Sequence, residues 1–219
     1  MSDAIRVGLV GYGYASKTFH APLISGTPGL ALTTVSSSDA AKVHADWPGV
    51  KVVSAASELL NDPEIDLVVI ATPNDTHFPL AKAALEAGKH VVVDKPFTVT
   101  LSQARELESL AKHCGRVLSV FHNRRWDSDF LTVRTLIDEG LLGEVCYFES
   151  HFDRFRPQVR QRWREQAGPG SGIWYDLGPH LLDQAVVLFG LPVSITVDLA
   201  QLRPGAQSTD YFHAVLAYP

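Results

Sequence analysis

Lys95 is the first side chain in this sequence whose type and position suit proton chemistry. It lies between Asp94 and Pro96, directly after a short apolar run that reads as a strand. Open α/β sheets bind their ligands at the carboxyl ends of the strands, and the proline restricts the backbone beside the lysine. We therefore expect Asp94 and Lys95 to face a cofactor crevice rather than bulk water. The alternative is a surface lysine at a strand end.

A second chemical motif, Asp-Leu-Gly-Pro-His, occupies residues 176–180. Because proline is tolerated in the first turn of a helix, the motif predicts Asp176 as a helix N-cap with His180 one turn further on. Side chains at i and i+4 share a helix face, where a carboxylate can orient an imidazole and stabilise its protonated form. Asp176 and His180 are thus catalytic candidates, whereas we interpret Asp183 as structural. A capping aspartate and a buried histidine without chemistry are the alternative.

The third motif, Gly-Tyr-Gly-Tyr-Ala-Ser, follows the first apolar run and precedes a predicted helix. In that context a G-x-G pattern indicates a dinucleotide phosphate site. Gly11 permits the tight turn, and Gly13 lets backbone N–H groups and the helix N-terminus approach a pyrophosphate. The third position is Ser16 rather than glycine or alanine, so the pattern is incomplete, although a serine is small and its hydroxyl could meet a phosphate. We include Tyr14 in this predicted site; a turn without a ligand is the alternative.

The second predicted strand ends in three serines and an aspartate, with a lysine three residues later. An NAD site normally has a carboxylate here that accepts from the ribose, whereas hydroxyls and an ammonium hold a 2′-phosphate. Ser36, Ser37 and Lys42 therefore favour NADP, with NAD as the alternative. Two other interpretations stay open. Ser38 or Asp39 could cap the next helix, with Lys42 on its solvated face, or Asp39 could be the ribose acceptor.

The fourth predicted strand ends in Ala-Thr-Pro-Asn-Asp-Thr-His, at the same carboxyl edge as the motifs above. Ligands of such sheets bind at this edge. We expect four of these residues to border the cofactor: Thr72, Pro73, Asn74 and His77.

The elements that must position these residues are readable in the first half of the chain. Short β-branched runs recur at residues 5–10, 30–36, 50–53, 66–70, 90–93 and 117–121. Their uniformly apolar character is typical of strands buried on both faces, as in a parallel sheet. Helices lie between them, one at 77–87 that ends at Gly88 and one at 101–113 with a capping box of Thr100 and Gln103 and a stop at Gly115. This alternation predicts an α/β fold with a doubly wound parallel sheet of the Rossmann type.

The pattern changes after residue 122, so we predict two domains, 1–122 and 123–219. The second reads as an α+β domain with a mainly antiparallel sheet, containing a helix at 129–139, a strand at 145–152, a helix that ends near Gly190, and alternating strands at 193–202 and 211–218. The chain stops inside strand-like sequence. We therefore expect a C-terminally truncated chain with an incomplete sheet and an exposed edge strand.

Composition narrows the function further. The chain has 219 residues, of which 46% are hydrophobic, and a formal net charge of −5. No apolar run approaches the ~18 residues of a membrane span, and the start of the chain lacks a secretory pattern, so we expect a cytoplasmic protein that binds no membrane. Cys114 and Cys146 lack metal-type spacing and lie in apolar segments, which predicts buried reduced thiols and no metal.

Residues 151–164 carry five arginines among aromatic side chains. Such a mixture occurs in nucleic-acid-binding segments, but the negative net charge and the lack of a nucleic-acid-binding motif argue against that partner. We expect a loop beside a pocket instead, in which one or two arginines meet an anionic or hydroxyl-rich substrate.

Taken in order, these motifs resemble the glucose–fructose oxidoreductase/inositol dehydrogenase (Gfo/Idh/MocA) family over essentially the whole chain. The resemblance rests on the G-x-G turn, the Thr-Pro-Asn segment with its histidine, Ala-Gly-Lys-His-Val at 87–91 leading to Asp-Lys-Pro, and the Asp-x-Gly-x-His-x-x-Asp pattern at 176–183. It implies a Rossmann domain, a second α/β domain with a large antiparallel sheet, and dimers or tetramers formed through that sheet. It also implies NAD- or NADP-dependent chemistry on sugars, polyols and related carbonyl compounds. The family's Glu-Lys-Pro lysine corresponds to Lys95, with Asp94 in place of the glutamate, and its Asp and His correspond to Asp176 and His180.

The activity that we expect is hydride transfer between a nicotinamide and a carbinol or carbonyl carbon. His180 would exchange the proton on the oxygen, Lys95 would polarise that oxygen, and Asp176 would support His180; the roles of Lys95 and His180 could be exchanged. The alternatives are a non-catalytic dinucleotide-binding regulatory module, an inactive fragment, or an isomerisation or elimination that regenerates the cofactor. The expected partners are a small-molecule substrate and, once the sheet is complete, a second copy in a homodimer.

Overall fold

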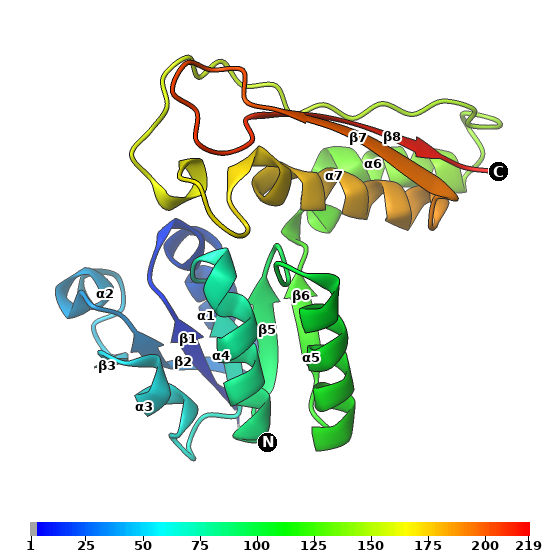
Figure 1. Cartoon of the computed structure of the whole chain (residues 1–219). Coiled ribbons are helices and arrows are strands. Elements are labelled where there is room, and N and C mark those ends of the chain that lie inside the picture. The colour runs from blue at the N-terminus through cyan, green and yellow to red at the C-terminus, as the bar shows by residue number, and fades with distance from the viewer. Residues whose placement is uncertain (1–3) are drawn as a thin grey trace. The chain divides into compact units, whose positions relative to one another are not determined.

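The computed structural model describes residues 4–219, which divide into two compact units, one ending at Phe121 and one spanning His122–Pro219 (Figure 1). In the first unit, strands and helices alternate in the order β1 (Ile5–Val10), the π-helical turn η1 (Ser16–His20), α1 (Ala21–Gly26), β2 (Leu30–Ser36), α2 (Ala40–Asp46), β3 (Lys51–Val53), α3 (Ala56–Leu60), β4 (Leu67–Ile70), α4 (Asn74–Glu86), β5 (His90–Asp94), α5 (Leu101–Cys114) and β6 (Leu118–Phe121).

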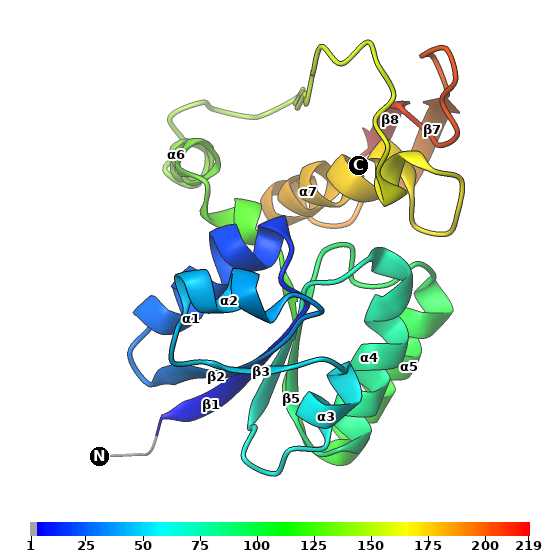
Figure 2. The same ribbon diagram turned by 90° about the vertical axis from the view of Figure 1, so that its left-hand side faces the viewer.

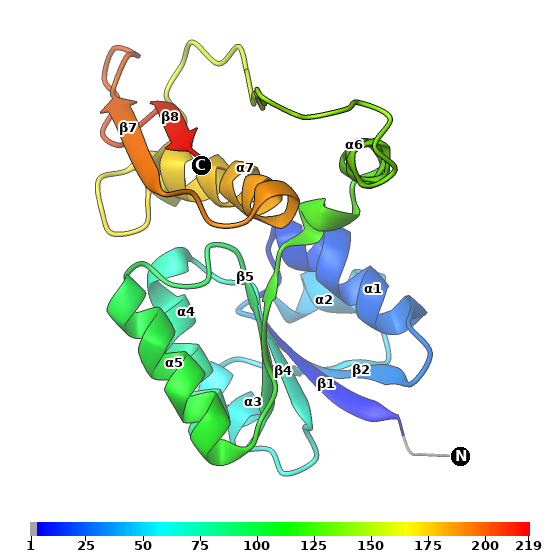
Figure 3. The same ribbon diagram turned by 90° about the vertical axis from the view of Figure 1, so that its right-hand side faces the viewer.

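The six strands of the first unit form one parallel sheet in the order β3-β2-β1-β4-β5-β6. Figures 2 and 3 show α1 and α2 on one face and α3, α4 and α5 on the other. The strand order reverses between β1 and β4, which is where such folds bind their ligands. The predicted doubly wound Rossmann sheet is confirmed, with every strand within two residues of its expected bounds.

Two buried apolar layers hold the sheet between its helices. Because successive side chains of a strand point to opposite faces, Leu9 and Val69 belong to the layer under α1 and α2, whereas Val68 and Ile70 belong to the layer under α3, α4 and α5. This two-sided burial is why the strands read as uniformly apolar runs.

The helix ends in the first unit follow local signals. Thr100 caps α5 by accepting from the N–H of Gln103, and Gly115 ends it in the left-handed conformation (φ 62°), as predicted. The expected start of α4 at residue 77 is wrong, because the helix begins at Asn74, immediately after Pro73. There the backbone N–H and the hydroxyl of Thr76 both donate to the Pro73 carbonyl, at 3.0 and 2.7 Å, which stabilises the earlier first turn.

The second unit contains a 3₁₀ turn η2 (Asn123–Trp126), helix α6 (Ser128–Asp138), a 3₁₀ turn η3 (Trp163–Glu165), the long helix α7 (Gly172–Phe189), and an antiparallel pair of strands, β7 (Ser194–Ala200) and β8 (Tyr211–Ala217). Aromatic side chains join α7 to β8 and the residue after it. Trp174 meets Phe212 edge-on with ring centroids 5.2 Å apart, and Phe189 meets Tyr218 at 5.9 Å. The α/β fold class with a small antiparallel sheet is thereby confirmed.

Two expectations for the second unit are wrong. Residues 145–152 form no strand and are mostly exposed, because β7 and β8 pair with each other and leave this segment outside both sheets. Helix α7 begins at Gly172 with Ser171 at its N-cap, so Asp176 is not the cap and Pro179 lies inside the helix. The earlier start is held by Thr209, whose carbonyl accepts from the Ile173 N–H at 2.6 Å.

The expectation of buried thiols is also wrong, since Cys114 is half-buried and Cys146 is exposed. Their segments are apolar in sequence, but Cys146 lies in the unpaired stretch described above. Within residues 4–219, no helix combines the length and the apolar character needed to span a membrane.

Candidate cofactor site and catalytic residues

The G-x-G turn leaves β1 at the point where the sheet order reverses. Gly11 has φ +88°, and a Cβ on it would lie 2.9 Å from the Ala71 carbonyl oxygen, so glycine is required here for both conformation and space. Its N–H donates to the Ser36 carbonyl at 3.0 Å. Beyond its chain neighbours, a Cβ on Gly13 would meet no described atom within 4 Å, which leaves open space above the turn. That space is where a phosphate would approach.

The helix that follows the turn begins with a buried serine. Ser16 is fully buried at the start of η1, and among the described residues its Oγ has no hydrogen-bond partner. Buried polar groups are nearly always satisfied, so an unsatisfied hydroxyl beside an open glycine turn and a helix N-terminus fits an anionic ligand. The residues of this turn therefore fit a dinucleotide phosphate.

A cluster that the sequence analysis missed fastens the turn to α2. The Tyr12 hydroxyl donates to Asp46 at 2.9 Å, and the Lys17 ammonium lies 2.8 Å from the same carboxylate. Burial and, secondly, the Asp46 contact raise the pKa of Tyr12 to about 12. Hydrogen bonds from Lys17 and Tyr12 lower the pKa of Asp46. No fixed spacing signals this cluster, because its members come from different elements.

At the end of β2, the structure shows the helix cap that was one of the alternatives for this segment. Asp39 caps α2, with its carboxylate accepting from the Lys42 N–H at 2.9 Å, while the Ser37 Oγ accepts from the Asp39 N–H at 3.1 Å. Lys42 does not simply extend into solvent: its ammonium donates to the Tyr12 carbonyl at 3.0 Å and lies over the Tyr12 ring. Ser36 is buried. The structure thus brings Lys42 to the G-x-G turn.

His77 joins two strand-end loops. It is buried, with Nδ1 2.8 Å from the Pro96 carbonyl oxygen and Nε2 3.0 Å from the Thr72 carbonyl oxygen. Carbonyl oxygens only accept, so a neutral ring donates to one of them and a protonated ring donates to both. Both ring nitrogens contact backbone carbonyl oxygens, so the ring ties the loops after β4 and β5 together and offers neither nitrogen to a ligand.

Around it, the Thr72 and Thr76 hydroxyls lie 2.6 Å apart, and Asn74 is buried in the first turn of α4. Pro73 precedes that turn as its N-cap. All of the predicted residues at the end of β4 therefore lie at one strand end.

Asp94 ends β5 beside a histidine that the sequence analysis did not select. His20 is buried in η1, contacts the Phe121 ring in a tilted arrangement with ring centroids 4.3 Å apart, and has Nε2 3.7 Å from the Asp94 carboxylate. Burial on its own raises the pKa of Asp94, but the contact with His20, the charge of Lys95 and the Lys95 backbone N–H together hold the pKa of Asp94 below its usual value. That N–H donates to the carboxylate at 2.7 Å. Asp94 thereby fixes the backbone that carries the half-buried Lys95.

In the second unit, Asp176 and His180 both lie on α7, one turn apart as predicted. Asp176 has its carboxylate 3.4 Å from the Arg164 guanidinium, and His180 is buried. Gly178 lies between them, where a Cβ would come within 3.1 Å of the Trp174 ring. Asp183 is held at 2.7 and 2.6 Å by both arms of Arg125, which agrees with a structural role.

No cluster of three or more His, Cys, Asp and Glu side chains suited to a metal occurs among residues 4–219.

Comparison with known proteins identifies the class. The model described as "Oxidoreductase family, NAD-binding Rossmann fold" matches residues 5–122, and the "GFO/IDH/MocA C-terminal domain" model matches residues 130–219. The chain therefore belongs to the GFO/IDH/MocA oxidoreductase family, which confirms the resemblance.

Individual relatives are similar over the whole chain. It is 82% identical over 219 residues to the uncharacterized oxidoreductase YdgJ of Escherichia coli, covering 100% of this chain and 63% of YdgJ. It is 41% identical to the scyllo-inositol 2-dehydrogenase (NADP(+)) IolW of Bacillus subtilis, covering 99% of this chain and 60% of IolW. The solved structure of YPO2259 from Yersinia pestis is 74% identical with a TM-score of 0.93, covering 100% of this chain and 62% of that one. The chain thus spans about three fifths of the length of these relatives.

The two contacts of His77 generate the first prediction. His77→Gln replaces two ring nitrogens by one amide nitrogen, so at least one of the two carbonyls loses its contact with a side-chain nitrogen. Loss of the donor to a buried carbonyl costs about 1–3 kcal/mol, and the change frees the Pro96 loop that carries Lys95. We expect a lower free energy of unfolding in urea and a weaker NADPH affinity by fluorescence titration. His113→Gln, on the exposed last turn of α5, should change neither. Unchanged stability of His77→Gln would contradict the bridging role.

The lowered pKa of Asp94 generates a prediction about pH. Because the folded-state value lies below that of the unfolded chain, the carboxylate contributes stability above about pH 4, and this contribution is lost as pH falls through the folded-state pKa. Asp94→Asn removes this titration, so its free energy of unfolding should fall less than that of the wild type between about pH 6 and about pH 3. Glu86→Gln, which changes an exposed carboxyl on α4, should keep the wild-type slope. Parallel slopes for Asp94→Asn and wild type would show that His20 and Lys95 do not act on this carboxylate.

Proposed function

We propose that this chain is the larger part of an NADP-dependent oxidoreductase that transfers a hydride between the nicotinamide and a small sugar, polyol or related carbonyl compound. In this proposal the Rossmann domain, residues 1–122, holds the dinucleotide, and residues 123–219 belong to the substrate domain. The observation that carries it is the G-x-G turn, where open space above Gly13 adjoins the buried Ser16 hydroxyl that has no partner among the described residues.

Three observations support NADP rather than NAD as the cofactor. The Lys42 ammonium lies against the G-x-G turn on the Tyr12 carbonyl. The Asp39 carboxylate, the one candidate for a ribose acceptor at the end of β2, is engaged in capping α2. The relative IolW is named as an NADP(+) enzyme. Ser36 and Ser37 then supply hydroxyls near a 2′-phosphate, and a lysine supplies its counter-charge.

The other residues proposed to contact the cofactor lie at the carboxyl ends of β1, β4 and β5. Backbone N–H groups of the turn would hold the pyrophosphate, with Tyr14 exposed at its outer side. The ends of β4 and β5 would border the nicotinamide half through Thr72, Pro73, Asn74 and Asp94, positioned by His77.

When bound, the nicotinamide supplies or accepts the hydride. The other steps belong to this chain's side chains. Lys95 donates a hydrogen bond to the substrate oxygen and so polarises it, and His180 gives that oxygen its proton or removes it. Asp176 keeps the imidazole oriented or accepts from a further substrate hydroxyl. Asp94 keeps the backbone of Lys95 in place through the hydrogen bond at 2.7 Å.

The proposed substrate class rests on the named relatives, and the proposed location in the cell rests on the cysteines. IolW is named for scyllo-inositol, and another relative, at 32% identity, is named 1,5-anhydro-D-fructose reductase, which supports a polyhydroxylated substrate. Both cysteines are free, which supports a reducing compartment and thus the cytoplasm. We further propose a homodimer formed through the sheet of the second domain in the full-length protein.

Nucleotide preference is the first test of the proposed function. Ser37→Asp places a carboxylate where a 2′-phosphate would lie, so NADPH affinity should fall at least about tenfold while NADH affinity stays the same or rises. Fluorescence titration of the full-length protein measures both. Ser109→Asp adds the same charge on an exposed position of α5 and should leave both affinities unchanged. A folded protein that binds neither nucleotide would disprove the oxidoreductase proposal and favour a scaffold or an inactive form.

Turnover tests the catalytic residues. With NADP+ and scyllo-inositol or a related polyol, Lys95→Ala and His180→Ala should each lower kcat at least about 100-fold, with NADPH affinity unchanged within a few-fold. Lys112→Ala and His113→Ala, both exposed on α5, are the matched controls. Wild-type turnover in either active-site variant would remove that residue from the mechanism. Tight nucleotide binding without turnover on any polyol would favour the regulatory module.

A further inference from the structure

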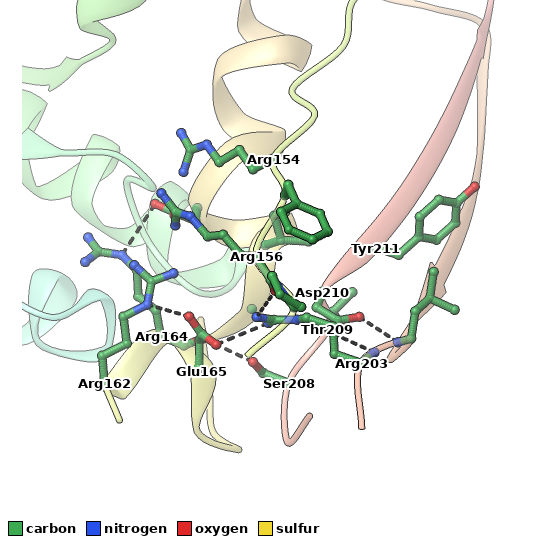
Figure 4. A pocket seen from close by; sticks show the side chains of 16 residues that line it. Arg154, Arg156, Arg162, Arg164, Glu165, Arg203, Ser208, Thr209, Asp210 and Tyr211 are labelled. Carbon is green, nitrogen blue, oxygen red and sulfur yellow. Dashed lines mark hydrogen bonds and ion pairs between the residues drawn. The ribbon is translucent and has the colours of Figure 1, made fainter. Parts of the chain in front are cut away.

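The second unit contains a pocket with a volume of about 310 Å³. Its lining comes from the arginine-rich segment before α7, from the first turns of α7, and from the connection between β7 and β8 (Figure 4). Apolar side chains, among them Phe155, Ile173 and Leu202, contribute part of the wall. A volume near 300 Å³ lies at the small end of ligand sites. This pocket therefore has room for a small metabolite.

The charges that line the pocket do not balance. Five arginines face three carboxylates, and each carboxylate already has an arginine partner. Glu165 is bound by Arg162 at 2.8 Å and by Arg203 at 3.2 Å. Arg203 also binds Asp210 at 2.8 Å, and Arg164 lies 3.4 Å from Asp176.

The other two arginines of the lining, Arg154 and Arg156, differ from these three. Among the residues that the structure describes, neither forms an ion pair, and the Arg154 guanidinium lies over the Phe152 ring at 5.6 Å. Figure 4 shows their guanidinium groups on the same side of the pocket as those of Arg162 and Arg164. Burial, followed by the positive charges of Arg154, Arg160 and Arg162, lowers the pKa of Arg156, and the Asp176 carboxylate offsets part of this effect. The positive potential at Arg156 is thus only partly neutralised by the protein.

The backbone of this segment is fixed independently of these two side chains. The Arg203 guanidinium donates to the backbone carbonyls of Arg156 and Gln158, both at 3.2 Å. The Ser208 hydroxyl donates to the Arg164 carbonyl at 3.1 Å. Arg203 therefore has a structural role, and it holds Arg156 through the backbone carbonyl rather than through the guanidinium.

We propose that this pocket binds the carboxylate or phosphate group of a small anionic molecule, with Arg156 and Arg154 as its ligands. Guanidinium groups match such oxyanions in planar, bidentate geometry. The candidate catalytic residue Asp176 lines the same pocket. Resting on the proposed function, the inference therefore narrows the substrate class to a polyhydroxylated acid or a phosphate ester of a sugar or polyol.

Titration calorimetry of the full-length protein, with and without NADPH, tests this inference with three probes that differ in charge: D-glucuronate, D-glucose 6-phosphate and D-glucose. Inorganic phosphate serves as a fourth probe. At least one anion should bind about tenfold or more tightly than D-glucose. Its affinity should fall as salt is added, because exposed charges are screened. Comparison of glucuronate with glucose 6-phosphate decides between a carboxylate and a phosphate.

The variants locate the binding site. Arg156→Gln should lower the affinity for the preferred anion at least about tenfold, and Arg154→Gln should lower it by a smaller factor, since Arg154 is the more exposed of the two. Neither should alter the affinity for NADPH. Arg134→Gln, on an exposed position of α6, is the matched control and should change nothing. Loss of affinity in Arg156→Gln with an unchanged urea midpoint excludes a folding defect.

Three results would overturn the inference: equal affinity for glucose and the anions, no binding of any anion up to about 10 mM, or unchanged anion affinity in Arg156→Gln. If NADPH binds and only neutral polyols turn over, the anion site fails while the proposed function stands. If an anion binds through Arg156 but neither nucleotide binds, the anion site stands while the proposed function fails.

Discussion

The site in the first unit depends on one steric constraint, the lack of room beside Gly11. β1 pairs in parallel with both β2 and β4, so the chain that leaves it must turn between the ends of two neighbouring strands. At that turn a Cβ would lie 2.9 Å from the Ala71 carbonyl oxygen and 3.0 Å from the Thr72 side chain. The Gly11 N–H at the same time donates to the Ser36 carbonyl. Three strand ends therefore meet at one residue, and a ligand that contacts the turn is close to all three.

The buried polar groups around this edge act as ties between loops. His77 joins the loops after β4 and β5, and Asp94 holds the backbone of Lys95 while it approaches His20. Hydrogen bonds between groups that are already desolvated compete little with water. A buried polar group that lacks a partner, in contrast, lowers the free energy of unfolding. Two buried atoms at this edge, Ser16 Oγ and His20 Nε2, have no hydrogen-bond partner among the described residues, although His20 lies 3.7 Å from the Asp94 carboxylate. A site whose loops are held in this way is organised before its ligand arrives.

Sequence reasoning succeeded where local patterns decide the structure. Strands buried on both faces are uniformly apolar, and the capping box at Thr100 is a contact between neighbours in the chain, so both could be predicted. It failed where a distant residue decides. The start of α7 depends on Thr209, 36 residues beyond Ile173, and residues 145–152 lack a partner strand. The Tyr12–Asp46 contact was likewise missed, because the two residues are 34 positions apart.

The arginine-rich segment shows why residue counts alone are a poor guide to function. Its arginines suggest polyanion binding when counted, but Arg162 and Arg164 are paired with carboxylates, and the side chains of Glu165 and Asp210 are buried only because arginines compensate them. What remains for a ligand is the local excess of charge after these pairs are made. A shared fold does not determine a substrate, which is recognised by loops that vary on a common scaffold. Any ligand preference of the second unit is therefore set by the residues that line its pocket, since the Rossmann sheet and the family define only a dinucleotide-binding fold.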